Sequence, residues 1–267
     1  MNTASEPVFV AQDGMWMPTG HARGPWNPHE CHGGAPSALL ARELERLEPG
    51  SEMVITRLTF GFLGAVPLAP LQVEAEIAKP GKRVQLLDGR VVADGRDVLR
   101  ARATRIRRGS ALDASPAGGG PLPGPDAGRV LPAFEGVQEE AFHPSAVEIR
   151  VVAGERGSGA MTAWFRLGRP LVADEAPSAL QRAVAAADFG NGVSAVLPFA
   201  DWLFVNTDLT VQLHREPVGE WIGLDARTDV SREGFGAAMS ILHDEEGRFG
   251  AAAQSLYVER RARDDLP

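Results

Sequence analysis

A five-residue sequence occurs twice in this chain of 267 residues, and this repetition limits the possible folds more than any other feature. Ala35-Pro36-Ser37-Ala38-Leu39 returns letter for letter as residues 176–180, at an offset of 141. Further matches follow in the same order at offsets of 150 to 152: Leu58-Thr59 with Leu209-Thr210, Pro67 with Pro217, and Gly95-Arg96 with Gly247-Arg248. A fixed order with small drifts in offset indicates duplication followed by loop insertion. We therefore expect two similar domains that face each other.

A stretch rich in glycine and proline separates the two copies. Ten of the twenty residues from Gly109 to Gly128 are Gly or Pro, which is typical of a linker. The predicted organisation is an N-terminal domain over 1–108, a linker over 109–135 and a C-terminal domain over 136–267. Each copy has the length of one small domain.

Each copy has the same predicted order of elements: a strand pair, one helix and then several long strands. The two helices are expected near Pro36 and over residues 178–187, with Pro36 and Pro177 in the first turn, where a helix tolerates proline. Pro49-Gly50 ends the first helix. The second helix is apolar nearly all round, so the rest of its domain must enclose it.

The long strands are expected over residues 53–63, 70–79, 82–93, 98–107, 220–230, 235–243 and 249–259. Period-two alternation also predicts one strand through residues 204–213. On that strand Val205, Thr207, Leu209, Val211 and Leu213 share one face, and Phe204, Asn206, Asp208, Thr210 and Gln212 share the other. The fold class is α+β, with one helix enclosed by a long antiparallel sheet in each half.

Composition excludes several classes of partner. The formal net charge of -8 argues against binding to nucleic acid or to an anionic membrane. A single cysteine, Cys31, cannot form an intrachain disulfide, which fits a reducing compartment. The N-terminus lacks the pattern of a secretory signal, and no apolar run is long enough to insert into a membrane. We expect a cytoplasmic protein.

Two motifs, together with the doubled helix and sheet, resemble a known family. Residues 26–28 (Trp-Asn-Pro) and 32–36 (His-Gly-Gly-Ala-Pro) open the first helix, and residues 206–210 (Asn-Thr-Asp-Leu-Thr) open a strand of the second half. Over nearly the whole chain this pattern is similar to the double-hotdog acyl-CoA thioesterases related to bacterial thioesterase II. The resemblance implies a tandem hotdog fold, an acyl-CoA substrate cleaved to free acid and coenzyme A, no cofactor, and possible assembly of chains into homo-oligomers.

The same resemblance implies which residues form the catalytic site. The family's Asp at the end of the second-half helix matches Asp188, and its Gln on the last strand matches Gln254. Where the family has a Thr this chain has Asn206, which is a departure. Thr207 is the nearest hydroxyl, but alternation turns it to the opposite face from Asp208, so Asn206 is preferred. An amide can hold a water molecule as a hydroxyl can.

Thioester hydrolysis needs a held water, a base, and donors aimed at the carbonyl oxygen. In this interpretation Asp188 is the base or orients the water, and Asn206 and Gln254 fix that water. The backbone N–H groups of Gly33, Gly34 and Ala35, at a helix start, are the expected oxyanion donors.

A structural alternative exists for each group in this interpretation. Asp188 could be a loop carboxylate, although the dipole disfavours a carboxylate at a helix C-terminus. Gln254 could be a buried amide satisfied by backbone groups, and Gly33-Gly34 could simply form a tight turn.

The repeat predicts one chemical site per chain, because the first copy lacks the key groups. At an offset of 141 Asp188 corresponds to Leu47, and at 152 Gln254 corresponds to Arg102. The resemblance then implies that the first half contributes its helix N-terminus and the second half contributes the side chains.

Three weaker sequence features could suggest a metal site, a cysteine nucleophile or a phosphate-binding surface. The segment His29-Glu30-Cys31-His32 holds metal-capable side chains, but adjacent residues cannot supply a tetrahedral site unaided, so no metal is expected. Cys31 is expected to be a small buried hydrophobe and not a nucleophile. A basic stretch is more consistent with a solvated strand edge than with coenzyme A phosphate binding; it comprises Arg100, Arg102, Arg105, Arg107 and Arg108.

Two other functions compete with hydrolysis. The pattern of hotdog enoyl-CoA hydratases is an Asp followed five residues later by a His. Here the residue five after Asp188 is Val193, which argues against a hydratase. A non-catalytic acyl- or acyl-CoA-binding protein is the alternative from another class, with Asn206 marking lost chemistry.

Overall fold

The computed structural model describes residues 6–109 and 121–261. The first half contains β1 (Phe9–Gln12), β2 (Met15–Pro18), the short helix η1 (Gly20–Ala22), α1 (Gly34–Glu45), β3 (Met53–Phe62), β4 (Gln72–Lys79), β5 (Val84–Ala93) and β6 (Arg96–Arg107).

The second half is longer and begins with short elements. It contains η2 (Pro125–Ala127), β7 (Arg129–Val130), η3 (Phe142–Ala146), β8 (Val147–Gly154), β9 (Ala160–Leu167), α2 (Ala179–Ala187), α3 (Gly190–Val193), β10 (Trp202–Asn206), β11 (Asp208–Leu213), β12 (Trp221–Val230), β13 (Phe235–Asp244) and β14 (Gly247–Arg260).

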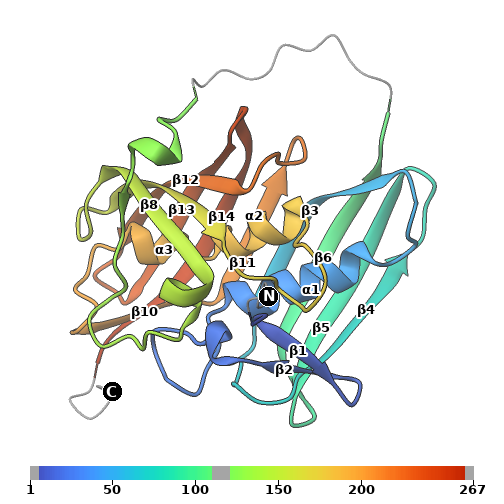
Figure 1. Ribbon diagram of the computed structural model, residues 1–267, viewed down its shortest axis with the longest axis horizontal. Coiled ribbons are helices and arrows are strands. Elements are labelled where there is room, and N and C mark those ends of the chain that lie inside the picture. Colours follow the sequence, from blue (N-terminus) through green and yellow to red (C-terminus); the bar gives the residue numbers. More distant parts are fainter. Residues whose placement is uncertain (1–5, 110–120, 262–267) are drawn as a thin grey trace, which may run out of the picture.

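One continuous antiparallel sheet joins the two halves, and both main helices lie on one face of it (Figure 1). Within the described residues this sheet has twelve strands, in the order β4-β5-β6-β3-β11-β14-β13-β12-β9-β8-β7, with β10 also paired to β14. In the first half, a bridge between Trp16 and Leu71 places β2 next to the start of β4. In the second half, β9 lies next to β12 in the equivalent position. Each half is thus a hotdog with the same strand order, and the predicted α+β tandem fold is confirmed.

The halves meet at β3 and β11, which pair antiparallel around Thr59 and Thr210. These two threonines are each other's counterpart in the sequence repeat, at an offset of 151. A residue pair that a twofold rotation exchanges must straddle the axis, so the pseudo-twofold axis passes between them. Their hydroxyls are 3.4 Å apart.

Helix α1 is buried on nearly every side, and two residues of the sheet allow this. A Cβ on Gly89 of β5 would come within 2.8 Å of a Leu40 methyl, so glycine lets the helix approach the sheet closely. Beyond the helix end, the guanidinium of buried Arg105 donates to the carbonyl of Leu47 at 2.8 and 2.9 Å. A cation there also complements the negative end of the helix dipole.

The repeated pentapeptide starts the two helices differently, which corrects the prediction for Pro177. Pro36 lies in the first turn of α1, as expected, whereas Pro177 precedes the N-cap of α2. Ser178 is that N-cap, and its hydroxyl accepts a hydrogen bond from the Gln181 N–H. A side-chain cap fixes where α2 begins, and the equivalent Ser37 is already inside α1.

The predicted single strand over 204–213 is wrong, because a β-bulge interrupts it at Thr207. Asn206 pairs with Leu256 of β14, but Thr210 pairs with Ala253, so one residue too many lies between them. The extra residue reverses the alternation: Phe204 is buried before the bulge and Leu209 after it. Asn206 and Asp208 therefore do not share a face.

The basic stretch does not lie on a strand edge, which corrects a third expectation. Strand β6 is internal, paired with β5 on one side and β3 on the other. Arg102 faces Asp88 on the neighbouring strand and binds it through two hydrogen bonds of 2.7 Å. Its charge is neutralised by a cross-strand ion pair instead of facing an unpaired edge.

The expected linker is partly structured. Residues 110–120 lie outside the described residues, but β7 pairs with β8, and Leu131 just after it is buried. Among the helices of the described ranges, none is both long and apolar enough to cross a membrane.

Candidate active site

The C-terminus of α2 meets the N-terminus of α1, and glycines make the contact possible. Asp188 is the C-cap of α2 and Gly33 is the N-cap of α1. A Cβ on Gly33 would lie 2.9 Å from Asp188 Oδ2, and one on Gly34 would lie 2.8 Å from the Ala185 carbonyl oxygen. The positive end of the α1 dipole thus faces a carboxylate that the dipole of α2 disfavours.

Asp188 is 4% exposed and is held by one side chain from each half. Its Oδ1 accepts a hydrogen bond of 2.9 Å from Asn206 Nδ2, and its Oδ2 lies 3.0 Å from His32 Nδ1. The structure therefore brings Asp188 and Asn206 together, as the sequence predicted, and adds a histidine from the first half.

The His32 ring is oriented by aromatic neighbours. Its centroid lies 4.3 Å from that of Phe189 and 5.2 Å from that of Phe142. The Gly34 N–H also approaches Nδ1, at 3.1 Å, so that nitrogen can accept from Gly34 or donate to Asp188. We assign the hydrogen to Nδ1, because a bare lone pair would otherwise face the carboxylate.

Asn206 keeps one acceptor free for a ligand or water. Its Nδ2 donates to Asp188 and also, at 3.2 Å, to the backbone oxygen of Asp208. Two acceptors around one atom identify that atom as the nitrogen, which leaves Oδ1 as the remaining acceptor.

Gln254 is 4% exposed and its amide is satisfied by backbone groups. Its Nε2 donates to the backbone oxygen of Asp188 at 3.2 Å, and its Oε1 accepts from the Asn191 N–H at 3.0 Å. The side chain is not among those that line the cavity beside Asp188. Gln254 thus holds the main chain on both sides of Phe189.

The three expected oxyanion donors differ in what they contact. The Ala35 N–H donates to the His32 carbonyl at 3.0 Å, so it is occupied. The Gly34 amide faces His32 Nδ1 and is buried, whereas Gly33 lines the cavity. Among the described residues no acceptor lies against the Gly33 N–H, which leaves it available to a ligand.

A cavity of about 310 Å³ opens beside Asp188 and is built from both halves and from the expected linker. Its apolar and aromatic lining includes Trp26, Phe62, Val66, Leu131, Phe134, Ile149, Phe189, Val193 and Val205. Such a mixture of apolar wall and few polar groups is typical of a small-molecule site.

Burial shifts the pKa of several titratable residues in the cavity wall, among them Cys31 and Glu30. Burial, and secondarily the nearby Glu30 carboxylate, raises the pKa of the Cys31 thiol to about 12. Burial also raises the pKa of Glu30, against the opposing effect of its hydrogen bond from Asn27. Cys31 is therefore not activated as a thiolate, in line with the expectation that it is not a nucleophile.

His32 is the site residue that sequence reasoning missed as a partner of Asp188. The sequence places it in the motif of residues 32–36 and among the metal-capable side chains of residues 29–32, but neither pattern pairs it with Asp188. A signal was present, because at the offset of 141 His32 corresponds to Ala173, so the two copies differ there as they do at Asp188. Three-ligand metal clusters among the described residues do not include that segment.

A second pocket of about 230 Å³ occupies the pseudo-twofold related position. Ile55 and Leu213 line it, and at an offset of 151 they correspond to Asn206 and Phe62 of the first cavity. One of its carboxylates, Glu45, accepts hydrogen bonds from Ser178 and Gln181. The pairing of β11 with β14 and of β3 with β6 makes Ala103 the counterpart of Gln254. The sequence offset of 152 gives Arg102, one residue away.

Comparisons with solved structures agree with this fold. A thioesterase of Novosphingobium aromaticivorans superposes with a TM-score of 0.71 at 23% identity, covering 95% of this chain and 99% of that one. A thioesterase II of Thermobifida fusca gives a TM-score of 0.71 at 16% identity, covering 97% of each chain. The tesB protein of Mycobacterium avium subspecies paratuberculosis gives 0.70 at 14% identity, covering 93% and 95%.

Comparison with protein families is more specific, although no curated protein matches the sequence. Residues 22–106 match the acyl-CoA thioesterase N-terminal domain, and residues 113–258 match the acyl-CoA thioesterase C-terminal domain. The two matches together span most of the chain, in the order of the two hotdogs. This protein therefore belongs to the acyl-CoA thioesterase family.

Proposed function

We propose that this chain hydrolyses a fatty or related acyl-CoA to the free acid and coenzyme A by direct attack of water. The observation that carries the proposal is the buried Asp188 carboxylate, held between Asn206 and His32 at the wall of a largely apolar cavity. A carboxylate with fixed donors on both oxygens presents its remaining lone pairs in a defined direction, as a base for water requires.

In the proposed reaction, Asp188 removes a proton from the water while the water oxygen bonds to the carbonyl carbon of the thioester. Asn206 Oδ1 accepts the second hydrogen of that water, which fixes the angle of attack. The negative charge that develops on the carbonyl oxygen is stabilised by the Gly33 N–H and the positive end of the α1 dipole. The C–S bond then breaks, the thiolate leaves, and the proton on Asp188 neutralises it directly or through solvent.

His32 and Gln254 have supporting roles in this proposal. His32 donates to Asp188 Oδ2 and so fixes the carboxylate plane. Gln254 is a positioning residue, because its amide holds the backbone of Asp188 and Asn191 and does not face the cavity.

The alternative is a protein that binds acyl-CoA without cleaving it. Asn206 supports it, because both hydrogens of its amide are used by protein acceptors, so it cannot donate to water as a hydroxyl can. Steady-state turnover on a panel of acyl-CoA thioesters, with binding measured in parallel, separates the two. Release of free coenzyme A thiol supports hydrolysis, and saturable binding without thiol release supports the alternative.

A further inference from the structure

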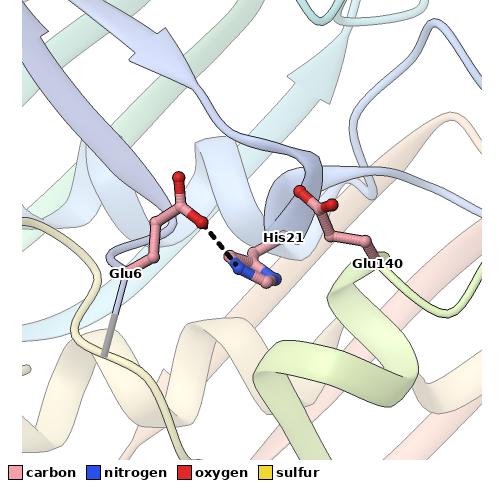
Figure 2. A group of neighbouring side chains, drawn as sticks. All are labelled: Glu6, His21 and Glu140. Carbon is pink, nitrogen blue, oxygen red and sulfur yellow. Dashed lines mark ion pairs between the residues drawn. The ribbon is translucent and has the colours of Figure 1, made fainter. Parts of the chain in front are cut away.

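We propose that Glu6, His21 and Glu140 form a site for a divalent transition cation of the zinc type. One ligand atom from each residue lies within 4.8 Å of the other two. Figure 2 shows the two carboxylates on either side of the His21 ring. The three residues come from the N-terminal segment, η1 and the segment before η3, so an ion there would join parts of the chain that are far apart in sequence.

The hydrogen bonds of His21 leave one ring nitrogen for a ligand. The Ser145 hydroxyl donates its single hydrogen to the Ala141 carbonyl at 2.6 Å, so it must accept from His21 Nδ1 at 2.7 Å. The Ser145 hydroxyl thus takes the hydrogen on Nδ1, and Nε2 faces the Glu6 carboxylate. Metal-binding histidines are commonly oriented by a hydrogen bond at their second nitrogen.

The two carboxylates are held by their backbones while their side chains stay adjustable. Arg169 donates to the Glu6 backbone oxygen at 3.2 Å, and Arg23 donates to the Glu140 backbone oxygen. His21 is 5% exposed, but the Glu6 side chain is 59% exposed and Glu140 is also exposed. A rigid histidine with two movable carboxylates can close around an ion at little cost.

The distance between His21 and Glu6 fits shared coordination. Nε2 and Oε2 are 3.3 Å apart, longer than the ~2.7–2.9 Å of a charge-assisted hydrogen bond. Two ligands at about 2.0–2.1 Å from a tetrahedral zinc ion are about 3.3 Å apart. An imidazole also favours zinc and similar ions over Mg²⁺ and Ca²⁺.

Gly20 provides room for the third ligand. A Cβ at this position would come 2.0 Å from Glu140 Oε1, so any larger residue would displace that carboxylate. Gly20 has no positive φ, so Gly20→Ala is compatible with the backbone and tests the site without removing a ligand.

The experiment is titration of the EDTA-treated full chain with Zn²⁺ against a chromophoric chelator, with Tm measured in parallel. We expect one site per chain, a higher Tm with Zn²⁺, and no effect of Mg²⁺ at the same concentration. Glu6→Gln, Glu140→Gln and Gly20→Ala should each weaken Zn²⁺ binding at least tenfold. Glu139→Gln, which removes a neighbouring exposed carboxylate, is the matched control and should bind as the parent does.

Two results would overturn the proposal. One is the absence of a stoichiometric Zn²⁺ site, which would leave only the direct contact between His21 and Glu6. The other is equal binding by the Glu140→Gln and Glu139→Gln variants, which would place the zinc elsewhere. Neither outcome depends on whether the chain hydrolyses thioesters.

Discussion

At the scale of single residues, Asp188 lies between two opposed helix dipoles. The C-terminus of α2 disfavours its charge, while the N-terminus of α1 and the donors Asn206 and His32 favour it. Each dipole contribution is about 0.3–1 kcal/mol, so the two largely cancel and the hydrogen bonds decide the carboxylate's position. The fixed geometry thus depends on both halves of the chain.

Asp188→Asn is expected to reduce kcat by about 10²–10⁴-fold, the usual contribution of a general base, with little change in substrate Kd. Asparagine keeps the size but removes the charge, and its single amide oxygen can accept from only one of the two donors, Asn206 or His32. The measurement is steady-state hydrolysis with Kd from calorimetry, and Glu45→Gln is the control because it neutralises a buried carboxylate of the other pocket. Turnover at the parent rate in Asp188→Asn would remove this residue from the mechanism.

Asn206→Thr is expected to retain or raise turnover, because a hydroxyl can both donate to and accept from the attacking water. Asn206→Leu should lose turnover, since it removes the water ligand and one donor to Asp188. Both kcat values are compared with the parent on the same acyl-CoA. Unchanged hydrolysis in the leucine variant would shift the role to Thr207, which also lines the cavity.

The proximity of Asp188 and Asn206 agrees with the prediction, but the strand pattern used to choose Asn206 is wrong. An unbroken strand would place Asn206 on the same face as Asp208. The bulge at Thr207 places them on different faces, and Asn206 reaches Asp188 for that reason. A bulge depends on the register with β14, which no local pattern in residues 204–213 contains.

At the scale of elements, the same five residues serve two helices in different ways. In α2 the Ser178 hydroxyl caps the helix and also donates to the Glu45 carboxylate of α1. In α1 the equivalent Ser37 is fully buried, and its hydroxyl has no hydrogen-bond partner among the described residues. An identical sequence therefore predicts a helix start but not its position, which the packing of the two helices sets.

Ser178→Ala is expected to lower the free energy of unfolding by about 1 kcal/mol, through loss of the N-cap. Ser37→Ala is the matched control at the same place in the repeat. It should be neutral or stabilising, because it removes a buried hydroxyl without a partner. Urea unfolding of both variants measures the difference, and equal losses would contradict the distinction between the two helix starts.

Glu45 should make stability fall as pH rises above about 4.5. Burial raises its pKa in the folded state above the ordinary 4.5 of a glutamate, against the hydrogen bonds from Gln181 and Ser178. The folded state then binds this proton more tightly than the unfolded state, so its contribution is present at low pH and is lost as pH rises through the folded pKa. Glu45→Gln removes this dependence.

The test of Glu45 is a comparison of the variant and the parent at several pH values. The unfolding free energy of Glu45→Gln minus that of the parent should become more positive between pH 4 and pH 7. Taking the difference cancels the titration of all other groups to first order. A difference that is flat or falls with pH would contradict the role assigned to burial.

At the scale of the whole molecule, the repeat predicted two similar domains that face each other, and the structure joins their sheets into one. Leu58-Thr59 and Leu209-Thr210 are counterparts in sequence, and the two threonines face each other across the junction of β3 and β11. What the repeat could not predict is the part that breaks symmetry. Leu131 and Phe134, from the expected linker, line the cavity beside Asp188, and nothing in a Gly- and Pro-rich composition indicates where such a segment packs.

The two pseudo-symmetric pockets also differ in charge, which bears on how many substrates one chain binds. The pocket beside Glu45 is lined by the further carboxylates Glu48 and Glu216 and by one cation, Arg105. In the other cavity the two cations Arg23 and Arg156 balance the two carboxylates Glu30 and Asp188. Coenzyme A carries several phosphate charges, so the acidic pocket repels it and the other does not.

We therefore expect one acyl-CoA per chain, bound in the cavity beside Asp188. Calorimetric titration with a non-hydrolysable acyl-CoA thioether should give a stoichiometry of one per chain. Sedimentation at the same protein concentration gives the oligomeric state. Glu216→Gln should leave Kd unchanged, because that carboxylate lies at the pocket beside Glu45. Val205→Trp, in the wall of the cavity beside Asp188, should fill that cavity and weaken acyl-CoA binding at least tenfold. A stoichiometry of two would mean that duplication left two binding sites, and the charge difference between the pockets would then not select between them.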